Sequence, residues 1–149
     1  MKTIFDQLRK DHKTQRSLAN TLLRTTGYDN EREQLFEQLK IELKAHANSE
    51  ERYFYEPMFE HDQSQVKARH SIAEHHDIDE MIEKLNKTGL SSPAWLVNYR
   101  KLREVVFHHL DEEENEVFQV AGKVMTDSQK SSLGDGYRNM MDEQKEKLS

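Results

Sequence analysis

The spacing of apolar residues along the chain predicts five helices and no strands. In the first, at about residues 3–25, one stripe is approximated by Phe5, Leu8, His12, Leu18 and Leu22. The second begins near residue 30, and its predicted inner face carries Leu35, Leu39, Leu43, His46, Glu50, Phe54 and Met58. A repeat every three or four positions is typical of a helix that buries one face. Similar patterns predict further helices at residues 62–87, 92–123 and 126–145.

Residues that favour helix ends support these boundaries. Four predicted starts carry a capping residue with a partner at a suitable spacing: Thr3 with Asp6, Asn30 with Glu33, Ser92 with Pro93, and Thr126 with Gln129. We expect Gly27 to end the first helix, and Pro57 to kink or shorten the second in its last turn. Gly134 and Gly136 lower the helix propensity of the fifth.

The first four helices form an internal repeat. Because 75 − 12, 109 − 46 and 113 − 50 are all 63, one shift places His12 on His75, His46 on His109 and Glu50 on Glu113. The apolar positions Phe36, Leu39, Leu43, Phe54 and Tyr55 fall on Tyr99, Leu102, Val106, Val117 and Phe118. Such a repeat predicts two helical hairpins, at residues 3–60 and 62–123, related by a pseudo-twofold axis.

The predicted fold is therefore all-α: an up-and-down four-helix bundle with an additional C-terminal helix, forming a single domain over residues 1–149. The last helix, at residues 126–145, has no counterpart in the repeat. We expect it to pack on the outside of a finished bundle.

Composition narrows the functional classes. The net charge of −6 and the lack of a basic stripe argue against a nucleic-acid partner. No apolar run approaches the roughly 20 residues that span a bilayer, and the charged N-terminal segment does not resemble a signal peptide, so no membrane partner is expected. The chain has no cysteine, which excludes disulfides and thiolate chemistry. These features favour a cytoplasmic location.

The repeated polar residues predict a metal site. Residues four apart share one face of a helix about 6 Å apart along its axis, so His46 with Glu50, and His109 with Glu113, each present an imidazole and a carboxylate to one point. The other helix of each hairpin adds one histidine. The candidate ligands of a dinuclear metal site are His12, His46, Glu50, His75, His109 and Glu113. Imidazole and carboxylate donors suit iron or manganese and also zinc, and a carboxylate can bridge two cations.

Four separated motifs carry a family resemblance. They are Asp11-His12-Lys13, His46-Ala47-Asn48-Ser49-Glu50-Glu51, Glu74-His75-His76-Asp77-Ile78-Asp79 and His108-His109-Leu110-Asp111-Glu112-Glu113-Glu114. With them, residues 11–118 resemble the hemerythrin-like, or HHE cation-binding, family. The resemblance implies a four-helix bundle with a non-haem centre of two iron ions, bridged by carboxylates and by an oxo or hydroxo group.

The resemblance also limits the functional classes to be expected. Members of such a family include dioxygen carriers, redox sensors, iron-handling proteins and proteins that respond to nitric oxide or peroxide. We therefore expect a protein that binds or senses dioxygen or a related small ligand, such as peroxide or nitric oxide. The alternatives are a di-iron redox enzyme, either peroxidase-like or nitric-oxide-reducing, and an iron-buffering protein.

One departure from the family pattern weakens the carrier role. Reversible dioxygen carriers of this family use a fifth histidine one turn from the third-helix histidine, whereas the positions four away from His75 are Ser71 and Asp79. His70 and His76 lie about 140° and 100° around the helix from His75, too far to reach the same ion. Asp79 is on the correct face and is a possible further carboxylate.

The remaining histidines and glutamates have a less specific interpretation. Four histidines lack a histidine partner in the repeat and are expected on the surface or in contact with the ligands from outside: His61, His70, His76 and His108. Glu51 and Glu114 do repeat, but they lie about 100° off the ligand face and are expected to be solvated or to contact ligands from outside. We interpret Met140 and Met141 as packing residues.

Overall fold

The computed structural model describes residues 2–26 and 30–149, and all regular structure in these residues is helical. The elements are α1 (Ile4–Leu23), α2 (Asn30–Glu50), the π-helical turn η1 (Glu51–Tyr55), α3 (Glu56–Met58), α4 (Asp62–Asn86), α5 (Pro93–Glu112), the π-helical turn η2 (Glu113–Val117), α6 (Phe118–Val124) and α7 (Asp127–Leu148). The segments α2, η1 and α3 follow one another without a break, as do α5, η2 and α6. Each set forms one long helix of the bundle.

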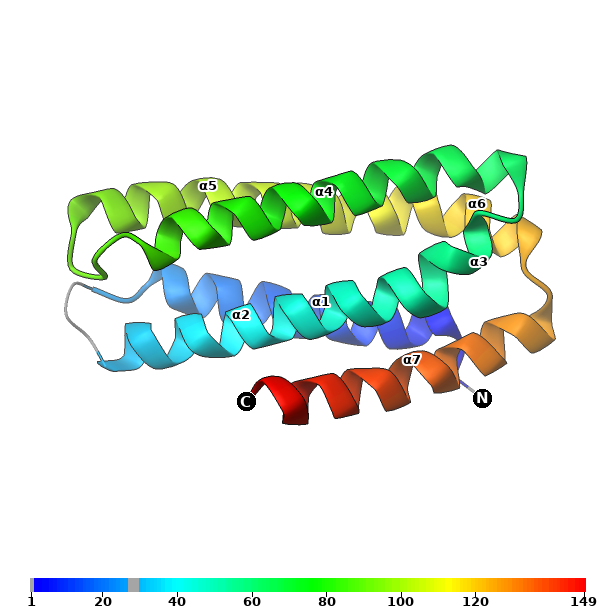
Figure 1. Ribbon diagram of the computed structural model, residues 1–149, viewed down its shortest axis with the longest axis horizontal. Coiled ribbons are helices and arrows are strands. Elements are labelled where there is room, and N and C mark those ends of the chain that lie inside the picture. The colour runs from blue at the N-terminus through cyan, green and yellow to red at the C-terminus, as the bar shows by residue number, and fades with distance from the viewer. Residues whose placement is uncertain (1, 27–29) are drawn as a thin grey trace.

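The helices form the predicted up-and-down bundle. Helices α1 and α2 make the first hairpin, and α4 and α5 with its extension α6 make the second (Figure 1). Helix α7 packs along α1 and α2, on the side of this hairpin that faces away from α4 and α5 (Figure 1). The two hairpins thus share one core, but only the first is covered by a fifth helix.

Local capping explains where the helices begin. Both capping boxes are present, with the side chains of Thr3 and Thr126 accepting from the backbone three residues on. Ser92 caps α5 through the backbone N–H of Ala94. Asn30 is the first helical residue of α2 rather than the cap before it, so that boundary differs by one residue. Gly27 lies outside the described residues.

The two π-helical turns were not predicted. Pro57 was expected to kink or end the second helix, yet the helix continues to Met58 and its irregular turn, η1, precedes the proline. The second hairpin has the matching turn η2 without any proline, so proline is not the cause of both. Each π turn begins at or directly after a candidate ligand, Glu50 or Glu113. Such turns are frequent at functional sites, because they rotate the neighbouring side chains relative to the rest of the helix.

Two apolar clusters lie on either side of a buried polar layer. One includes Ile4, Leu8, Phe54, Met58 and Phe118, and the other includes Leu22, Phe36, Leu85, Trp95 and Tyr99. Along each of the four bundle helices, the buried histidines and glutamates lie between residues of the two apolar clusters. Burial of the apolar clusters stabilises the bundle at about 25 cal/mol per Å² and holds the polar layer in place. None of the helices in the described part of the chain is long and apolar enough to cross a membrane.

The glycines of α7 have a packing role. A side chain at Gly134 would bring a Cβ to 2.8 Å from the backbone nitrogen of Ile4, and one at Gly136 would overlap the ring of Tyr53. Both positions therefore need glycine for α7 to lie close against the start of α1 and the end of the first hairpin. This close approach offsets the low helix propensity that the sequence indicated.

Candidate metal centre

The six predicted ligand residues meet in the middle of the bundle, and all are buried. Their donor atoms form two overlapping clusters, in each of which the atoms lie within 4.8 Å of one another. The first cluster contains His12, His46, Glu50 and Glu113, and the second contains Glu50, His75 and His109. Because the clusters share Glu50, they describe two adjacent positions rather than two remote sites.

Each glutamate lies between histidines of different hairpins. Glu50 Oε1 is 3.4 Å from His46 Nε2 and 3.1 Å from His75 Nε2. Glu113 Oε1 is 3.0 Å from His12 Nε2, and Glu113 Oε2 is 3.7 Å from His109 Nε2. Both carboxylates therefore occupy a position from which they could bridge two cations.

Three of the histidines are oriented by carboxylates. His12 Nδ1 lies 2.7 Å from Glu114, His75 Nδ1 lies 2.9 Å from Glu51, and His109 Nδ1 lies 2.8 Å from Glu74. Since an ionised carboxylate only accepts hydrogen bonds, each Nδ1 donates, and in the neutral ring the lone pair of Nε2 is left for a cation. Glu51 and Glu114 thus contact the candidate ligands from outside.

His46 is oriented differently, by a tyrosine of α7. The hydroxyl of Tyr137 is 2.7 Å from His46 Nδ1 and donates to Asp11 Oδ2 at 2.5 Å. Arg138 donates to the same Asp11 oxygen at 3.0 Å. The hydroxyl accepts from His46, so His46 Nε2 is also left free. The last helix packs on the outside of the bundle as expected, and in addition its Tyr137 reaches the polar layer.

The donor set fits a pair of cations. Nine buried side-chain atoms of the described residues make no hydrogen bond, and four of them, in Gln15, Glu42, Ser49 and Trp95, lie outside the candidate ligands. The other five belong to candidate ligands: His12 Nε2, His46 Nε2, both oxygens of Glu50 and Glu113 Oε1. His75 Nε2 and His109 Nε2 face each other at 3.1 Å, which brings two lone pairs together when both rings are neutral and carry their proton on Nδ1. Each unpaired buried group costs about 1–3 kcal/mol. A pair of cations would satisfy the five atoms of the candidate ligands at once.

The electrostatics of the centre also favour cations. Burial by itself would lower the pKa of His12, but hydrogen bonds and charges from Glu113 and Glu114 raise this pKa to about 9. His75 shows the same balance, since Glu50 and Glu51 outweigh burial and raise its pKa to about 10. The carboxylates around these histidines therefore favour positive charge at the centre, which a bound cation would supply.

A buried tyrosine beside the centre was missed by the sequence analysis. The hydroxyl of Tyr55, in η1, donates to Glu113 Oε2. Burial, with the charges of Glu113 and Glu50, raises the pKa of Tyr55 well above its ordinary value, so the phenol keeps its proton. The repeat partner of Tyr55 is Phe118, which has no hydroxyl. That difference in the sequence was the available signal.

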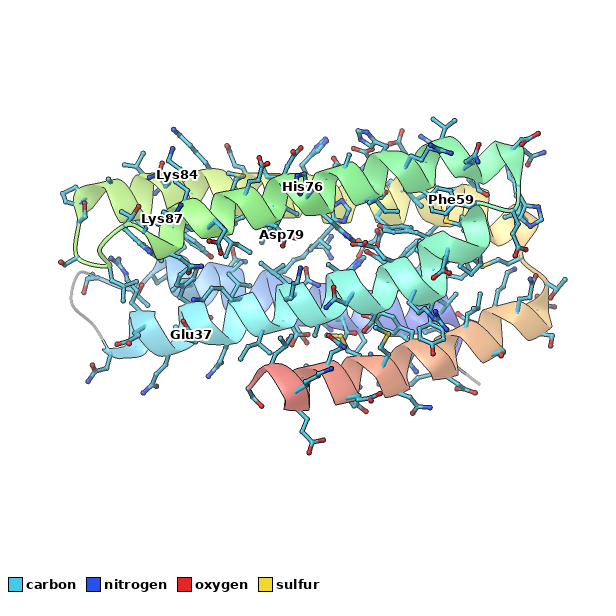
Figure 2. The ribbon with its side chains drawn as sticks, viewed as in Figure 1. Glu37, Phe59, His76, Asp79, Lys84 and Lys87 are labelled. Atoms are coloured by element: carbon cyan, nitrogen blue, oxygen red, sulfur yellow. The ribbon has the colours of Figure 1, made fainter. Side chains whose placement is uncertain are left out.

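Other candidate residues lie outside the two clusters. Asp79 pairs with Lys44 at 3.4 Å, and His76 lies 3.4 Å from Glu80 on the exposed side of α4; His76 and Asp79 are labelled in Figure 2. His61 caps α4 by its backbone position. His70 and His108 lie on the surface of the second hairpin, beside Glu74 and Glu112.

Comparison with known proteins identifies the family of the chain. Uncharacterised proteins of Mycobacterium tuberculosis and Mycobacterium bovis are 26% identical to the chain over 132 residues, which cover 88% of this chain and 80% of theirs. The crystal structure of a hemerythrin HHE cation-binding domain-containing protein from Mycobacterium kansasii superimposes with a TM-score of 0.88 at 23% identity, covering 99% of this chain and 90% of that one. The family model of the hemerythrin HHE cation-binding domain matches residues 3–121. The chain therefore belongs to the hemerythrin HHE cation-binding domain family.

Proposed function

We propose that this metal-binding protein holds two iron ions between Glu50 and Glu113, and that it binds dioxygen, peroxide or nitric oxide beside them. The donor set supports this proposal, because imidazole and carboxylate ligands suit iron and two carboxylates lie where they could bridge. Bound iron would supply open coordination positions and exchange electrons with the small ligand. Manganese and zinc suit the same donors, so metal analysis of the purified protein is the first test.

The observation that carries the ligand proposal is a small cavity at the centre. It has a volume of about 20 Å³, and three candidate ligands line it: His46, His75 and His109. About 10–15 Å³ holds one water-sized molecule, so the cavity suits a diatomic molecule or peroxide and excludes larger substrates.

Two polar residues line the cavity besides the candidate ligands, Gln15 and Asp79, and the Asp79 carboxylate pairs with Lys44 at 3.4 Å. Leu43, Ile78 and Val106 make part of its wall apolar. Gln15 also lines it, and the side-chain nitrogen of Gln15 is buried without a hydrogen-bond partner. An amide donor beside an apolar wall favours a small ligand that accepts a hydrogen bond.

Azide binding to the oxidised, iron-loaded protein tests this assignment. We expect Gln15→Leu to weaken azide binding about tenfold, the effect of losing one hydrogen bond to a charged group. The readout is an optical titration of the azide adduct, with Gln38→Leu on the exposed side of α2 as the matched control. Equal azide affinity in the Gln15 variant and the wild type would refute the ligand assignment.

The reaction with air tests the carrier role. Both halves of the centre contribute two histidines, and no fifth histidine flanks His75, since Ser71 occupies that position. We therefore expect the reduced protein to oxidise in air to a stable form without a persistent oxygen adduct, and Ser71→His to lengthen the life of any adduct. Stopped-flow spectra of a lasting adduct that disappears when oxygen is removed would restore the carrier assignment.

Tyr55 supports a second candidate, an enzyme that consumes peroxide. Disproportionation of two hydrogen peroxide molecules to two water molecules and one dioxygen needs no external reductant, but it needs a group that moves protons. The Tyr55 hydroxyl is buried and donates to Glu113, a position from which it could do so. Oxygen release from peroxide should then fall at least tenfold in Tyr55→Phe while the iron content stays unchanged. Equal oxygen release in both proteins would exclude this role of Tyr55.

A further inference from the structure

A second group of histidines and glutamates lies on the surface of the second hairpin. His70 and Glu74 are four residues apart on α4, and His108 and Glu112 are four residues apart on α5. His70 Nε2 is 3.0 Å from Glu112 Oε1 and 3.5 Å from Glu74 Oε2, and His108 Nε2 is 3.1 Å from Glu112 Oε2. The donor atoms of His70, Glu74 and Glu112 all lie within 4.8 Å of one another.

These distances are compatible with ligands of one ion. Zinc binds imidazole nitrogen and carboxylate oxygen at about 2.0–2.1 Å, so two donors on a tetrahedral ion lie about 3.3–3.4 Å apart. The two contacts of His70 bracket that value. The four-residue step from histidine to glutamate is also the step of the buried centre, His46 to Glu50 and His109 to Glu113.

The first hairpin shows what occupies the equivalent place. The repeat offset of 63 takes Glu74 to Asp11 and His70 to Gln7. There the guanidinium group of Arg138, from α7, donates to Gln7 Oε1 at 2.8 Å and to Asp11 Oδ2 at 3.0 Å. A cationic side chain therefore fills this position on the hairpin that α7 covers.

The second hairpin has no such cation of its own. Helix α7 packs on α1 and α2, not on the outer surface of α4 and α5 (Figure 1). Within residues 2–26 and 30–149, the ion-pair partners of Glu74 and Glu112 are all histidines. The repeat positions of His108 and Glu112 in the first hairpin are Ala45 and Ser49, so the second hairpin alone has a full set of donors.

We propose that His70, Glu74 and Glu112 bind a divalent transition-metal cation of the zinc class at a surface site separate from the buried centre. His108 contacts the second oxygen of Glu112 and orients that carboxylate. Glu74 joins the two sites, since its Oε2 faces His70 while its Oε1 accepts from His109 Nδ1. The surface ion occupies the place that Arg138 takes on the first hairpin.

Counting bound zinc tests the proposal. The wild-type protein is equilibrated with micromolar Zn²⁺, separated from free metal and analysed, and we expect one more ion than the buried centre holds. His70→Ala should lose that ion, with its dissociation constant raised more than about tenfold. His76→Ala is the matched control, because His76 is an exposed histidine of α4 that also has a glutamate one turn away, Glu80. We expect this control to keep the ion.

The double variant Glu50→Gln/Glu113→Gln separates the surface site from the buried centre. It should lose the buried ions and keep the surface ion, so failure of the buried centre would not remove the surface signal. Circular dichroism verifies that each variant is folded, and His70 is exposed enough for its replacement to leave the core intact. Retention of the extra ion in His70→Ala, its loss in His76→Ala as well, or its absence from the wild type would each overturn the proposal.

Discussion

The two hairpins deliver the same donors to the centre but hold one of their histidines in different ways. His12 and His75 are equivalent in the repeat and have equivalent partners, Glu114 and Glu51. The other two histidines, His46 and His109, are equivalent in the repeat but do not have equivalent partners. His109 is held directly by Glu74, whereas His46 is held by Tyr137, which in turn contacts Asp11.

The difference arises because α7, a helix outside the repeat, contributes Tyr137 to the site. Asp11 occupies the repeat position of Glu74, but its side chain is one methylene group shorter. The phenol of Tyr137 fills the space between the shorter carboxylate and His46. The family model ends at residue 121, before α7 begins at Asp127, so this contact comes from a segment beyond the matched domain.

The largest effect that would test the equivalence of the two halves is the loss of a ligand. His46→Ala and His109→Ala should each bind less than the full pair of metal ions, since the facing groups lose a shared cation. An ion present at a hundred times its dissociation constant stabilises a fold by about 2.7 kcal/mol, so the melting temperature of the loaded protein should fall by roughly 5–10 °C. Metal analysis and thermal unfolding measure both effects, with His76→Ala as control. Two ions per chain in both ligand variants would contradict the site.

A smaller effect on metal affinity is expected at Tyr137, the residue that distinguishes the support of His46 from that of His109. Tyr137→Phe removes the acceptor of His46 Nδ1 and a donor to Asp11, without changing the ligands themselves. Loss of such an outer contact lowers metal affinity about 10–100-fold. Competition with a chelator should show this loss for one of the two ions. An unchanged affinity would mean that α7 is only a packing element.

Restoring the repeat should reverse that loss. In Asp11→Glu/Tyr137→Phe, a longer carboxylate at position 11 can reach His46 as Glu74 reaches His109. We expect the double variant to recover at least half of the lost binding free energy, measured by the same competition. Asp11→Glu alone is the control, and failure of the double variant to exceed Tyr137→Phe would show that the two hairpins cannot be made equivalent in this way.

The smallest effect on metal affinity is expected at Glu51 and Glu114, which have equivalent contacts in the two hairpins. In Glu51→Gln and Glu114→Gln the amide oxygen can still accept from the histidine, so metal affinity should fall by less than about tenfold, and by similar factors in the two variants. Glu50→Gln and Glu113→Gln should weaken binding more, because they remove charge that faces both cations. A larger loss at Glu51 than at Glu50 would reverse the assigned roles.

The sequence predicted the fold and the meeting of the six residues because both depend on periodicity. The helical stripe and the offset of 63 place His12, His46, His75 and His109 on inner faces without reference to side-chain packing. The π turns could not be predicted, since they depend on how the helix ends pack around the polar layer. Glu51 and Glu114 were expected to be solvated or to contact the ligands from outside, and they contact His75 and His12. Asp11 and Glu74 could also have been found, because they are acidic positions that repeat.

Tyr137 could not be identified in this way, since it lies outside the repeat and only packing of α7 brings it to His46. Its role depends on Gly134 and Gly136, which let α7 approach closely, and on Arg138, which also contacts Asp11. From the sequence, His70 and His108 of the surface cluster could be identified only as histidines that lack a histidine partner in the repeat. Its assembly required the spatial pairing of α4 with α5.

We expect the contact between Tyr137 and His46 to make metal loading depend on the order in which the helices are synthesised. A chain leaves the ribosome from its N-terminus, so α7 is the last of the described helices to emerge. Until α7 packs, His46 Nδ1 lacks its Tyr137 partner, so we expect any bound ion to be held less firmly. We therefore expect metal exchange to slow once α7 has packed against α1 and α2.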